Sequence, residues 1–417
     1  MINKALRRLI PQRAARPNQA HPGWASRLTL AGVVLALLAS LAMIDPPKPL
    51  DPPEPVAHTY TLYLPSVQLV PPPPAVTLSP LTNFAYGWSV FQYQSYRLPP
   101  PAGIKPEFPL YAPTSFNWIK VTASPNSAEL CGPNRLPYHV LLRLNKTDAN
   151  ATVQNVADDT WQWAHWMEPA SQPADQPRCV DAFEIGNEPN LSGPGQYNGP
   201  VSPARYADQL CAAYDAIKRT DPKYIVVSAG LAPTGGFADH SLGMESLAYL
   251  RAMLDEIRAN PVSHGDPGGC FDVLAYHNYG FRTGFATDPH GPACPAEMCF
   301  RGAEDTWAVL QDYGIRKQIW STETGWMRDY AAGGCASAPF AGTFGGFALS
   351  DKAQADNLVG AFQYARANWP WLGAMFVFNL DFNPPRRASD PCYDEQGWFA
   401  VQGHPAEAAL EAMPKTP

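Results

Sequence analysis

Two glutamates that lie far apart in the sequence each follow a short apolar run. Glu188 stands in "FEIGNEPN", which begins at Phe183, and Glu323 stands in "STETGW", which begins at Ser321. A pair of facing carboxyl groups can break a glycosidic bond, because a protonated one donates to the leaving oxygen while an ionised one attacks or activates water. Either glutamate alone could equally be a solvated carboxylate in a turn or an ion-pair partner, so the surrounding elements must decide.

Eight short apolar runs succeed one another along the chain, and most are followed by a helical pattern. Continuous apolar runs, in contrast to alternating ones, suit strands that are buried on both faces. Ser202 with Pro203, and Ser350 further on, are typical helix starts. No helix is visible after the first two runs. The predicted strands lie within residues 83–90, 116–122, 139–145, 182–188, 224–230, 271–279, 318–325 and 374–382.

This rhythm favours an α/β fold, a (β/α)₈ TIM barrel, with a doubly wound open sheet as the second choice. In such a barrel the reactive residues sit at the carboxyl ends of the strands. Polar residues cluster at these ends, and burying them is costly unless they line a site. They are Lys120, Arg143, Asn187, Glu188, His277, Asn278, Tyr279, Glu323, Asn379 and Asp381. Glu184 lies earlier in its strand and is expected to face a structural partner.

Three motifs carry a family resemblance. "EIGNEPN", "AYHNYG" and "STETGW", in this order at the ends of the fourth, sixth and seventh predicted strands, resemble clan A of the glycoside hydrolases. That clan includes the cellulase-like family five and the xylosidase-like family thirty-nine. The resemblance covers roughly residues 81–402 and implies a retaining double displacement without cofactor or metal. The two carboxyl groups are then expected to converge to roughly 5–5.5 Å.

The resemblance also implies roles for single residues. Glu188 would be the general acid/base, and Glu323 the nucleophile that forms a covalent glycosyl-enzyme. Asn187 would bond the sugar 2-hydroxyl, Tyr279 would orient Glu323, and His277 would line the pocket.

The sequence departs from the clan at two strand ends. Many members carry an arginine at the end of strand two, where this chain has Lys120, and a lysine cannot reproduce the forked donor geometry. Many members also end strand eight with a tryptophan as a sugar platform, where this chain offers Phe376 and Phe378. We still expect Lys120 to contact the substrate, but the identity of the sugar stays open.

Further aromatic and amide side chains are candidates for sugar binding. Trp88 and Trp326 follow strand ends and are predicted to stack on sugar rings, with core packing as the alternative. Asn379 is predicted to contact the substrate. The tryptophans of "WQWAHWM", residues 161–167, fall in a predicted helix and are expected to pack in the core.

The function indicated is hydrolysis of a β-linked poly- or oligosaccharide, with a carbohydrate as the partner. Two alternatives remain: a non-catalytic carbohydrate-binding protein on the same scaffold, and a cell-wall transglycosylase in which a second sugar replaces water. A serine hydrolase is not supported, because no Gly-x-Ser-x-Gly elbow occurs. A formal net charge of −7 without a basic patch argues against nucleic-acid binding. The sequence does not indicate the oligomeric state.

The N-terminal part is organised differently from the rest. Residues 1–27 are basic, residues 28–44 are uncharged and apolar, and residues 45–80 are rich in proline and read as a semi-rigid linker to a catalytic domain over 81–417. This order predicts export. Retention of an apolar membrane helix and its cleavage as a signal peptide both remain open.

Eight cysteines fit an exported protein, because disulfides persist in oxidising compartments. Cys294 and Cys299 in "CPAEMC" are close enough to close a small loop. The spacings match no regular zinc pattern, so no metal site is predicted.

Overall fold

Eight parallel strands form one sheet in the order β5-β4-β3-β2-β1-β8-β7-β6. The computed structural model describes residues 81–415, except 82, 91–115, 122–129, 131–137, 168–178, 194–195, 236–242, 343, 345 and 383–389. The predicted segments 1–27, 28–44 and 45–80 lie outside the described residues. The strands are β1 (Ala85–Val90), β2 (Trp118–Val121), β3 (His139–Leu144), β4 (Ala182–Ile185), β5 (Ile225–Ser228), β6 (Leu274–His277), β7 (Ile319–Thr324) and β8 (Leu372–Val377).

The two ends of this sheet meet and close it. Single parallel bridges join Val227 to Val273 and Leu231 to Tyr276. The backbone N–H of His277 donates to the carbonyl of Leu231 at 3.1 Å. All eight predicted strands are therefore confirmed, and together they make the predicted (β/α)₈ barrel in place of an open sheet.

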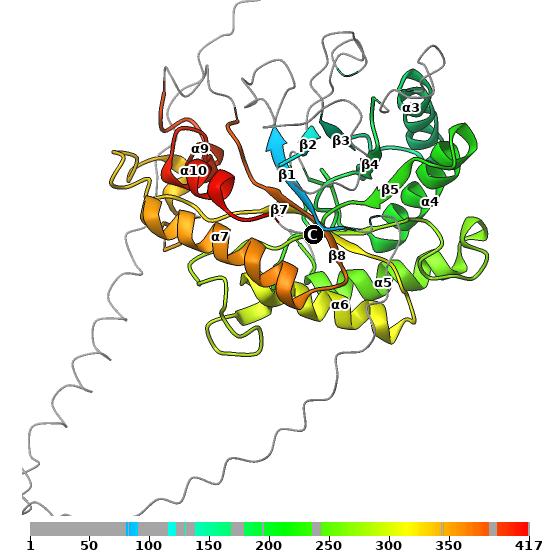
Figure 1. Cartoon of the computed structure of the whole chain (residues 1–417). Coiled ribbons are helices and arrows are strands. Elements are labelled where there is room, and N and C mark those ends of the chain that lie inside the picture. Colours follow the sequence, from blue (N-terminus) through cyan, green and yellow to red (C-terminus); the bar gives the residue numbers. More distant parts are fainter. Residues whose placement is uncertain are drawn as a thin grey trace, which may run out of the picture. The chain divides into compact units, whose positions relative to one another are not determined.

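Helices lie around the outside of the strands (Figure 1). Ser202 caps α4 by accepting from the backbone N–H of Arg205 at 3.2 Å, and Ser350 caps α7 in the same way, as predicted. The connections after β1 and β2 fall mostly outside the described residues. The helices are α3 (Val153–Trp166), α4 (Pro203–Thr220), α5 (Ser246–Ala259), α6 (Ala303–Asp312), α7 (Asp351–Asn368), α9 (Gln396–Phe399) and α10 (Pro405–Ala412), with 3₁₀ turns η2 (Pro261–Ser263), η3 (Pro295–Glu297), η4 (Phe300–Gly302) and η5 (Pro339–Gly342).

The barrel interior consists of layers. Large rings such as Trp118 and Trp320, whose centroids are 5.4 Å apart, alternate with small side chains such as Ala182 and Ala275. Because successive strand residues point to opposite faces, the next inward positions lie two residues further along each strand. On four of the strands these positions are polar and buried: Lys120, Glu184, His277 and Thr322. A dry lower layer thus supports a polar layer just below the carboxyl ends of the strands.

The tryptophans of α3 do not all pack in the core, so that prediction was wrong. Trp161 is 50% exposed and Trp166 is 54% exposed, while Trp163 packs partly buried against the core. At about 100° per residue, positions 161 and 163 lie on nearly opposite sides of the helix, so the three tryptophans cannot share one buried face. The buried face of α3 is instead Val156, Thr160 and Ala164.

Between pairs of described cysteines, three disulfides join Cys211 to Cys270, Cys294 to Cys299 and Cys335 to Cys392. The small loop predicted between Cys294 and Cys299 is confirmed. Among the residues described, no helix has the length and apolar character needed to cross a membrane.

Candidate active site

The polar layer is built around a fully buried lysine. The ammonium of Lys120 lies 2.8 Å from Glu184 Oε2 and 3.1 Å from Glu323 Oε1. Thr322 Oγ1 donates to Glu184 Oε1 at 2.7 Å. Glu184 therefore faces a structural partner, as expected. Lys120 was predicted to contact substrate, but it is 0% exposed and lies beneath Glu323, so that prediction is corrected.

The charge of Glu184 is fixed by its neighbours. Burial raises the pKa of its carboxyl, but Lys120 and His277 lower it more strongly, to about 2. Glu184 is thus ionised at any pH near neutrality and neutralises Lys120 from below.

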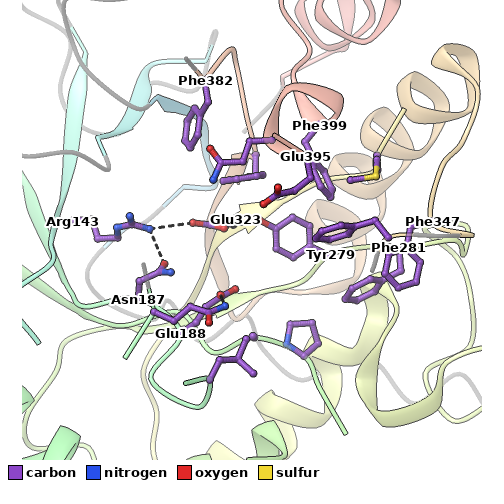
Figure 2. Close-up of a pocket in the computed structure, with 18 residues that line it drawn as sticks. Arg143, Asn187, Glu188, Tyr279, Phe281, Glu323, Phe347, Phe382, Glu395 and Phe399 are labelled. Atoms are coloured by element: carbon purple, nitrogen blue, oxygen red, sulfur yellow. Dashed lines mark hydrogen bonds and ion pairs between the residues drawn. The ribbon is translucent and has the colours of Figure 1, made fainter. Parts of the chain in front are cut away.

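Glu323, at the end of β7, receives donors from several strands. Tyr279 donates its hydroxyl to Glu323 Oε2 at 2.6 Å, and Arg143 Nη1 lies 3.6 Å from Oε1 (Figure 2). Burial raises the pKa of this carboxyl, but His277, Lys120 and Arg143 outweigh burial and hold it below its ordinary value. An ionised carboxylate with fixed donors on both oxygens can act as a positioned nucleophile.

Glu188 is presented by an unusual backbone turn after β4. Gly186 has φ +93°, and a Cβ there would overlap the side chain of Thr147. Glu188 itself has φ +40°, a conformation that non-glycine residues seldom adopt and that gathers at functional sites. Its backbone N–H donates to the carbonyl of Gly230 at 3.0 Å. The turn directs the Glu188 side chain across the barrel mouth, where Gln196 Nε2 donates to its Oε2 at 3.0 Å.

His277 joins the two carboxylates. Its Nδ1 lies 3.0 Å from Glu188 Oε1 and 3.5 Å from Glu323 Oε2. Burial lowers the pKa of this imidazole, but Glu323, Glu184 and Glu188 together raise it to about 9. The ring is 0% exposed and lies beneath the pair, so the prediction that it lines the pocket is corrected.

One acceptor or donor atom from each of Glu188, His277 and Glu323 lies within 4.8 Å of the others. Two carboxylates and an imidazole are also a donor set for a divalent cation. The surrounding charges do not fit a cation, because Lys120 contacts Glu323 and the raised pKa keeps His277 protonated at neutral pH. The arrangement suits a close pair of carboxyl groups better than a metal centre.

The pair opens into a pocket of about 480 Å³. Asn187, Glu188, Tyr279 and Glu323 line it. Arg143 Nη1 donates to Asn187 Oδ1 at 2.7 Å and so fixes the orientation of the amide. The structure thus brings together these four predicted site residues in one cavity with Arg143, which the sequence placed at the end of the third strand.

Three predicted substrate contacts lie elsewhere, and those predictions were wrong. Trp88 is 1% exposed and stacks on Phe116 with ring centroids 4.0 Å apart. Trp326 is 0% exposed, and its Nε1 donates to the carbonyl of Thr283 at 2.7 Å. Both indoles pack in the core cluster that includes the helices, and neither lines the pocket.

Asn379 is also 0% exposed. Its Nδ2 donates to the carbonyl of Gln396 at 2.9 Å, and its Oδ1 accepts from the backbone N–H of Phe382 at 3.1 Å. Asn379 therefore holds the loop after β8, from which Gln396 and Phe382 line the pocket. It supports the wall without being part of it.

The sequence analysis missed most of the pocket wall. Phenylalanines from the loops after β6, β7 and β8 surround the cavity, and of these only Phe378 had been considered. Phe281, Phe378 and Phe382 follow strand ends closely, and that position was the signal available. Phe344 and Phe347, in "GTFGGF" at residues 342–347, and Phe399 lie far beyond the strand ends without a motif to distinguish them. The wall includes Phe281, Phe344, Phe347, Phe378, Phe382 and Phe399.

No family model matches the chain. No curated protein matches it in sequence either. Among solved structures it resembles a glucosidase from Croceicoccus marinus, at 16% identity and a TM-score of 0.43, over 66% of this chain and 49% of that one. It also resembles a family 39 glycoside hydrolase from the gut symbiont Bacteroides cellulosilyticus WH2, at 13% identity and a TM-score of 0.47, over 79% and 64%. A third is a family 113 β-1,4-mannanase, at 12% identity and a TM-score of 0.45, over 80% and 97%.

The chain thus spans about half the length of the first of these proteins. All three similarities have TM-scores below 0.5, so they carry no weight for function. The barrel is defined by the strand order and register of this chain, and the chemistry has to be argued from the side chains in its mouth.

Proposed function

We propose that this protein is a retaining glycoside hydrolase that cleaves a β-glycosidic bond with Glu188 as acid/base and Glu323 as nucleophile. The observation that carries the proposal is the convergence of the two carboxylates, from β4 and β7, to within 4.8 Å between oxygens. Retaining enzymes hold their carboxyl groups about 5–5.5 Å apart, whereas inverting enzymes leave about 6.5–9.5 Å for a water molecule.

The reaction follows from the charges around each group. Glu323, kept ionised by Lys120 and Arg143, attacks the anomeric carbon while Glu188 gives its proton to the departing oxygen. A glycosyl ester on Glu323 results. Glu188, now a carboxylate, takes a proton from water, which attacks the same carbon and releases Glu323. The sugar product keeps its original anomeric configuration.

The neighbouring residues have supporting roles in this proposal. Tyr279 holds Glu323 in place through its 2.6 Å hydrogen bond. Arg143 fixes the amide of Asn187, whose nitrogen we assign to the sugar 2-hydroxyl. His277, charged at neutral pH, stabilises the negative charge that Glu188 acquires when it gives up its proton.

The decisive experiment uses Glu323→Ala with a panel of 4-nitrophenyl glycosides. We expect turnover to fall by at least about 10³-fold, since the covalent step is removed, and azide to restore part of it with an inverted glycosyl azide product. Exposed Glu256 on α5 provides the control, and Glu256→Ala should keep full activity. Normal activity in Glu323→Ala would refute the assignment, and inverted product from the wild type would refute retention.

Glu188→Ala tests the other carboxylate. Loss of the acid should slow the hydrolysis of glycosides with poor leaving groups far more than that of 4-nitrophenyl glycosides, because 4-nitrophenolate departs without protonation. Equal loss on both would remove the acid role. Binding of a glycan without turnover across the panel would favour the non-catalytic carbohydrate-binding alternative.

The predicted export also stays part of this proposal. The three disulfides fit an oxidising compartment. Attachment to a membrane through residues 28–44 concerns a segment outside the described residues and remains a prediction.

A further inference from the structure

The pocket has two chemically different ends. Figure 2 shows Arg143 and Asn187 on one side of the carboxylate pair and Phe281 and Phe347 on the other, beyond Tyr279. The volume of about 480 Å³ lies within the range of about 300–1,000 Å³ that is usual for small-molecule sites. The scissile bond would lie at the carboxylates, between the two ends.

The polar end can satisfy the hydroxyls of one sugar. Arg143 and Asn187 line it beside the carboxylates, whereas Glu395 lies between Glu323 and Phe399, above Tyr279 (Figure 2). The groups at the polar end offer both donors and acceptors, which a buried sugar ring needs for its hydroxyls.

The far end offers almost nothing to a second sugar. Its described lining from the loops after β6 and β7 is Tyr279, Phe281, Met327, Phe344 and Phe347. The rings of Phe281 and Phe347 meet edge to face at 5.2 Å, and Phe344 meets Phe347 at 6.2 Å. The one hydroxyl among these side chains, on Tyr279, donates to Glu323. Stacking on these rings would cover one face of a second sugar but leave its hydroxyls buried without partners, which is unfavourable.

The lining from the loops after β4 and β5 has the same character. It consists of Leu191, Ala232 and Pro233, together with Gln196, whose amide donates to Glu188. Around the acid/base, where the leaving group must lie, the described wall is therefore apolar.

Phe281 is held in an unfavourable backbone conformation. Its φ is +50°, in the left-handed region that a bulky side chain rarely adopts and that glycine adopts without strain. The conformation turns the ring into the pocket, against Tyr279 and Phe347. Strain of this kind gathers where a side chain has a binding role.

We infer that the substrate is a glycoside with an apolar leaving group, an alkyl or aryl alcohol that packs against Phe281 and Phe347. The inference rests on the proposed function and narrows its substrate class. In the first step the bond between the anomeric carbon and the aglycone oxygen breaks, the carbon bonds to Glu323, and the Glu188 proton passes to the oxygen. An apolar alcohol leaves, in contrast to the second sugar that an oligosaccharide would release.

The test compares n-alkyl β-glycosides of the sugar that the 4-nitrophenyl panel selects. Methyl, butyl and hexyl glycosides have leaving groups of similar basicity, so differences in kcat/KM report binding of the chain. We expect kcat/KM to rise at least tenfold from methyl to hexyl, because each buried methylene adds favourable transfer free energy. The hexyl glycoside should also exceed a β-linked disaccharide of the same sugar.

Phe281→Gly removes the ring and suits the local φ, so the loop can keep its conformation. We expect the hexyl-to-methyl ratio to fall to within about twofold of unity, and Phe347→Ala to reduce it as well. Trp161→Ala, which removes an exposed ring on α3 that is not part of the pocket lining, is the matched control and should leave the ratio unchanged.

Binding to the Glu323→Ala variant gives a readout without turnover. The hexyl glycoside should bind more tightly than the methyl glycoside and with a more negative heat-capacity change, the mark of apolar burial. A flat alkyl series, or a disaccharide cleaved at least as well as the hexyl glycoside, would overturn this inference and leave the proposed function intact. Failure to cleave any 4-nitrophenyl glycoside would overturn both.

Discussion

Two buried glutamates of this barrel have pKa values that are shifted in opposite directions. Glu184 lies inside the barrel on β4, is 0% exposed, and has a pKa lowered to about 2. Glu297 lies in the disulfide-closed loop between Cys294 and Cys299, is 6% exposed, and has a pKa raised to about 8. Both were transferred from water into the protein, so burial alone cannot explain the difference.

The groups that surround each carboxyl explain the difference between the two pKa values. Burial raises both pKa values, but Glu184 lies 2.8 Å from the ammonium of Lys120. The carboxylate of Glu297 accepts hydrogen bonds from the hydroxyl of Ser246 and, at 3.4 Å, from the hydroxyl of Tyr276. The nearby Glu245 and Asp305 carboxylates raise its pKa further. A buried carboxyl therefore stays ionised only where a cation is placed beside it.

The comparison shows how the site is made. Lys120 contacts both Glu184 and Glu323, so the pocket carboxylate Glu323 shares the cation that keeps Glu184 ionised. Glu297 shows how a buried carboxyl behaves when its neighbours are hydroxyls and further carboxylates. The next predictions separate these two environments.

Lys120→Met should have the largest effect. It leaves Glu184 and Glu323 buried without their shared cation, and removing one partner of a buried pair costs about 3–5 kcal/mol. Urea unfolding measures this loss. The acid limb of the pH–rate profile should also move to higher pH, because the pKa of Glu323 rises. Lys352→Met, at an 83% exposed side chain, is the control and should change neither. An unshifted acid limb would show that Lys120 does not set the charge of Glu323.

Glu297→Gln should change how stability depends on pH. The folded state raises the pKa of Glu297 from 4.5 to about 8, so its stabilising contribution is complete below pH 4.5 and is lost as pH rises to about 8. The wild type should lose about 3 kcal/mol relative to the variant across this window. Unfolding free energies at pH 5 and 8 measure it. Parallel pH curves for the two proteins would contradict the assignment.

Glu184→Gln should change how stability depends on pH in the acid range, below pH 4.5. Its lowered pKa contributes stability above pH 4.5 that is lost as pH falls towards 2. The wild type should lose about 2 kcal/mol more than the variant between these values. Acid unfolding at fixed ionic strength tests this, with exposed Glu256→Gln as the reference. Identical acid midpoints for Glu184→Gln and wild type would count against the ion pair.

Replacing Cys294 and Cys299 together by alanine should have the smallest effect. A disulfide that spans five positions restricts the unfolded chain little, so about 1–2 kcal/mol should be lost. The freed loop should also let Glu297 reach water, and the loss of stability towards pH 8 should shrink. If that pH dependence stays unchanged, the disulfide is not what keeps Glu297 buried.

Much of the fold could be read from local patterns. The eight apolar runs are long enough to be strands, and serine caps mark the starts of α4 and α7. Glu188 and Glu323 follow strand ends, and parallel strands of a barrel bring their carboxyl ends to one mouth. The convergence of these two carboxylates could therefore be expected from the sequence.

The side of the sheet to which each strand side chain points could not be read from the sequence. Strands buried on both faces lack the alternation of polar and apolar residues that would show which side points inward. Trp88 thus looked like a sugar platform, whereas the register of β1 turns it to the helices and stacks it on Phe116. The ion pair of Lys120 with Glu184 joins β2 to β4, and nothing near either residue in the sequence indicates it.

The sequence by itself determined the barrel and the two acidic strand ends, because strand length, caps and motif order are local properties. Only the tertiary structure decided which charges surround those acids and what lines the space above them. Ionisation depends on the distance to a cation on another strand, and the apolar wall arises where loops from three strand ends, none with a motif of its own, bring Phe281, Phe347 and Phe399 around one cavity.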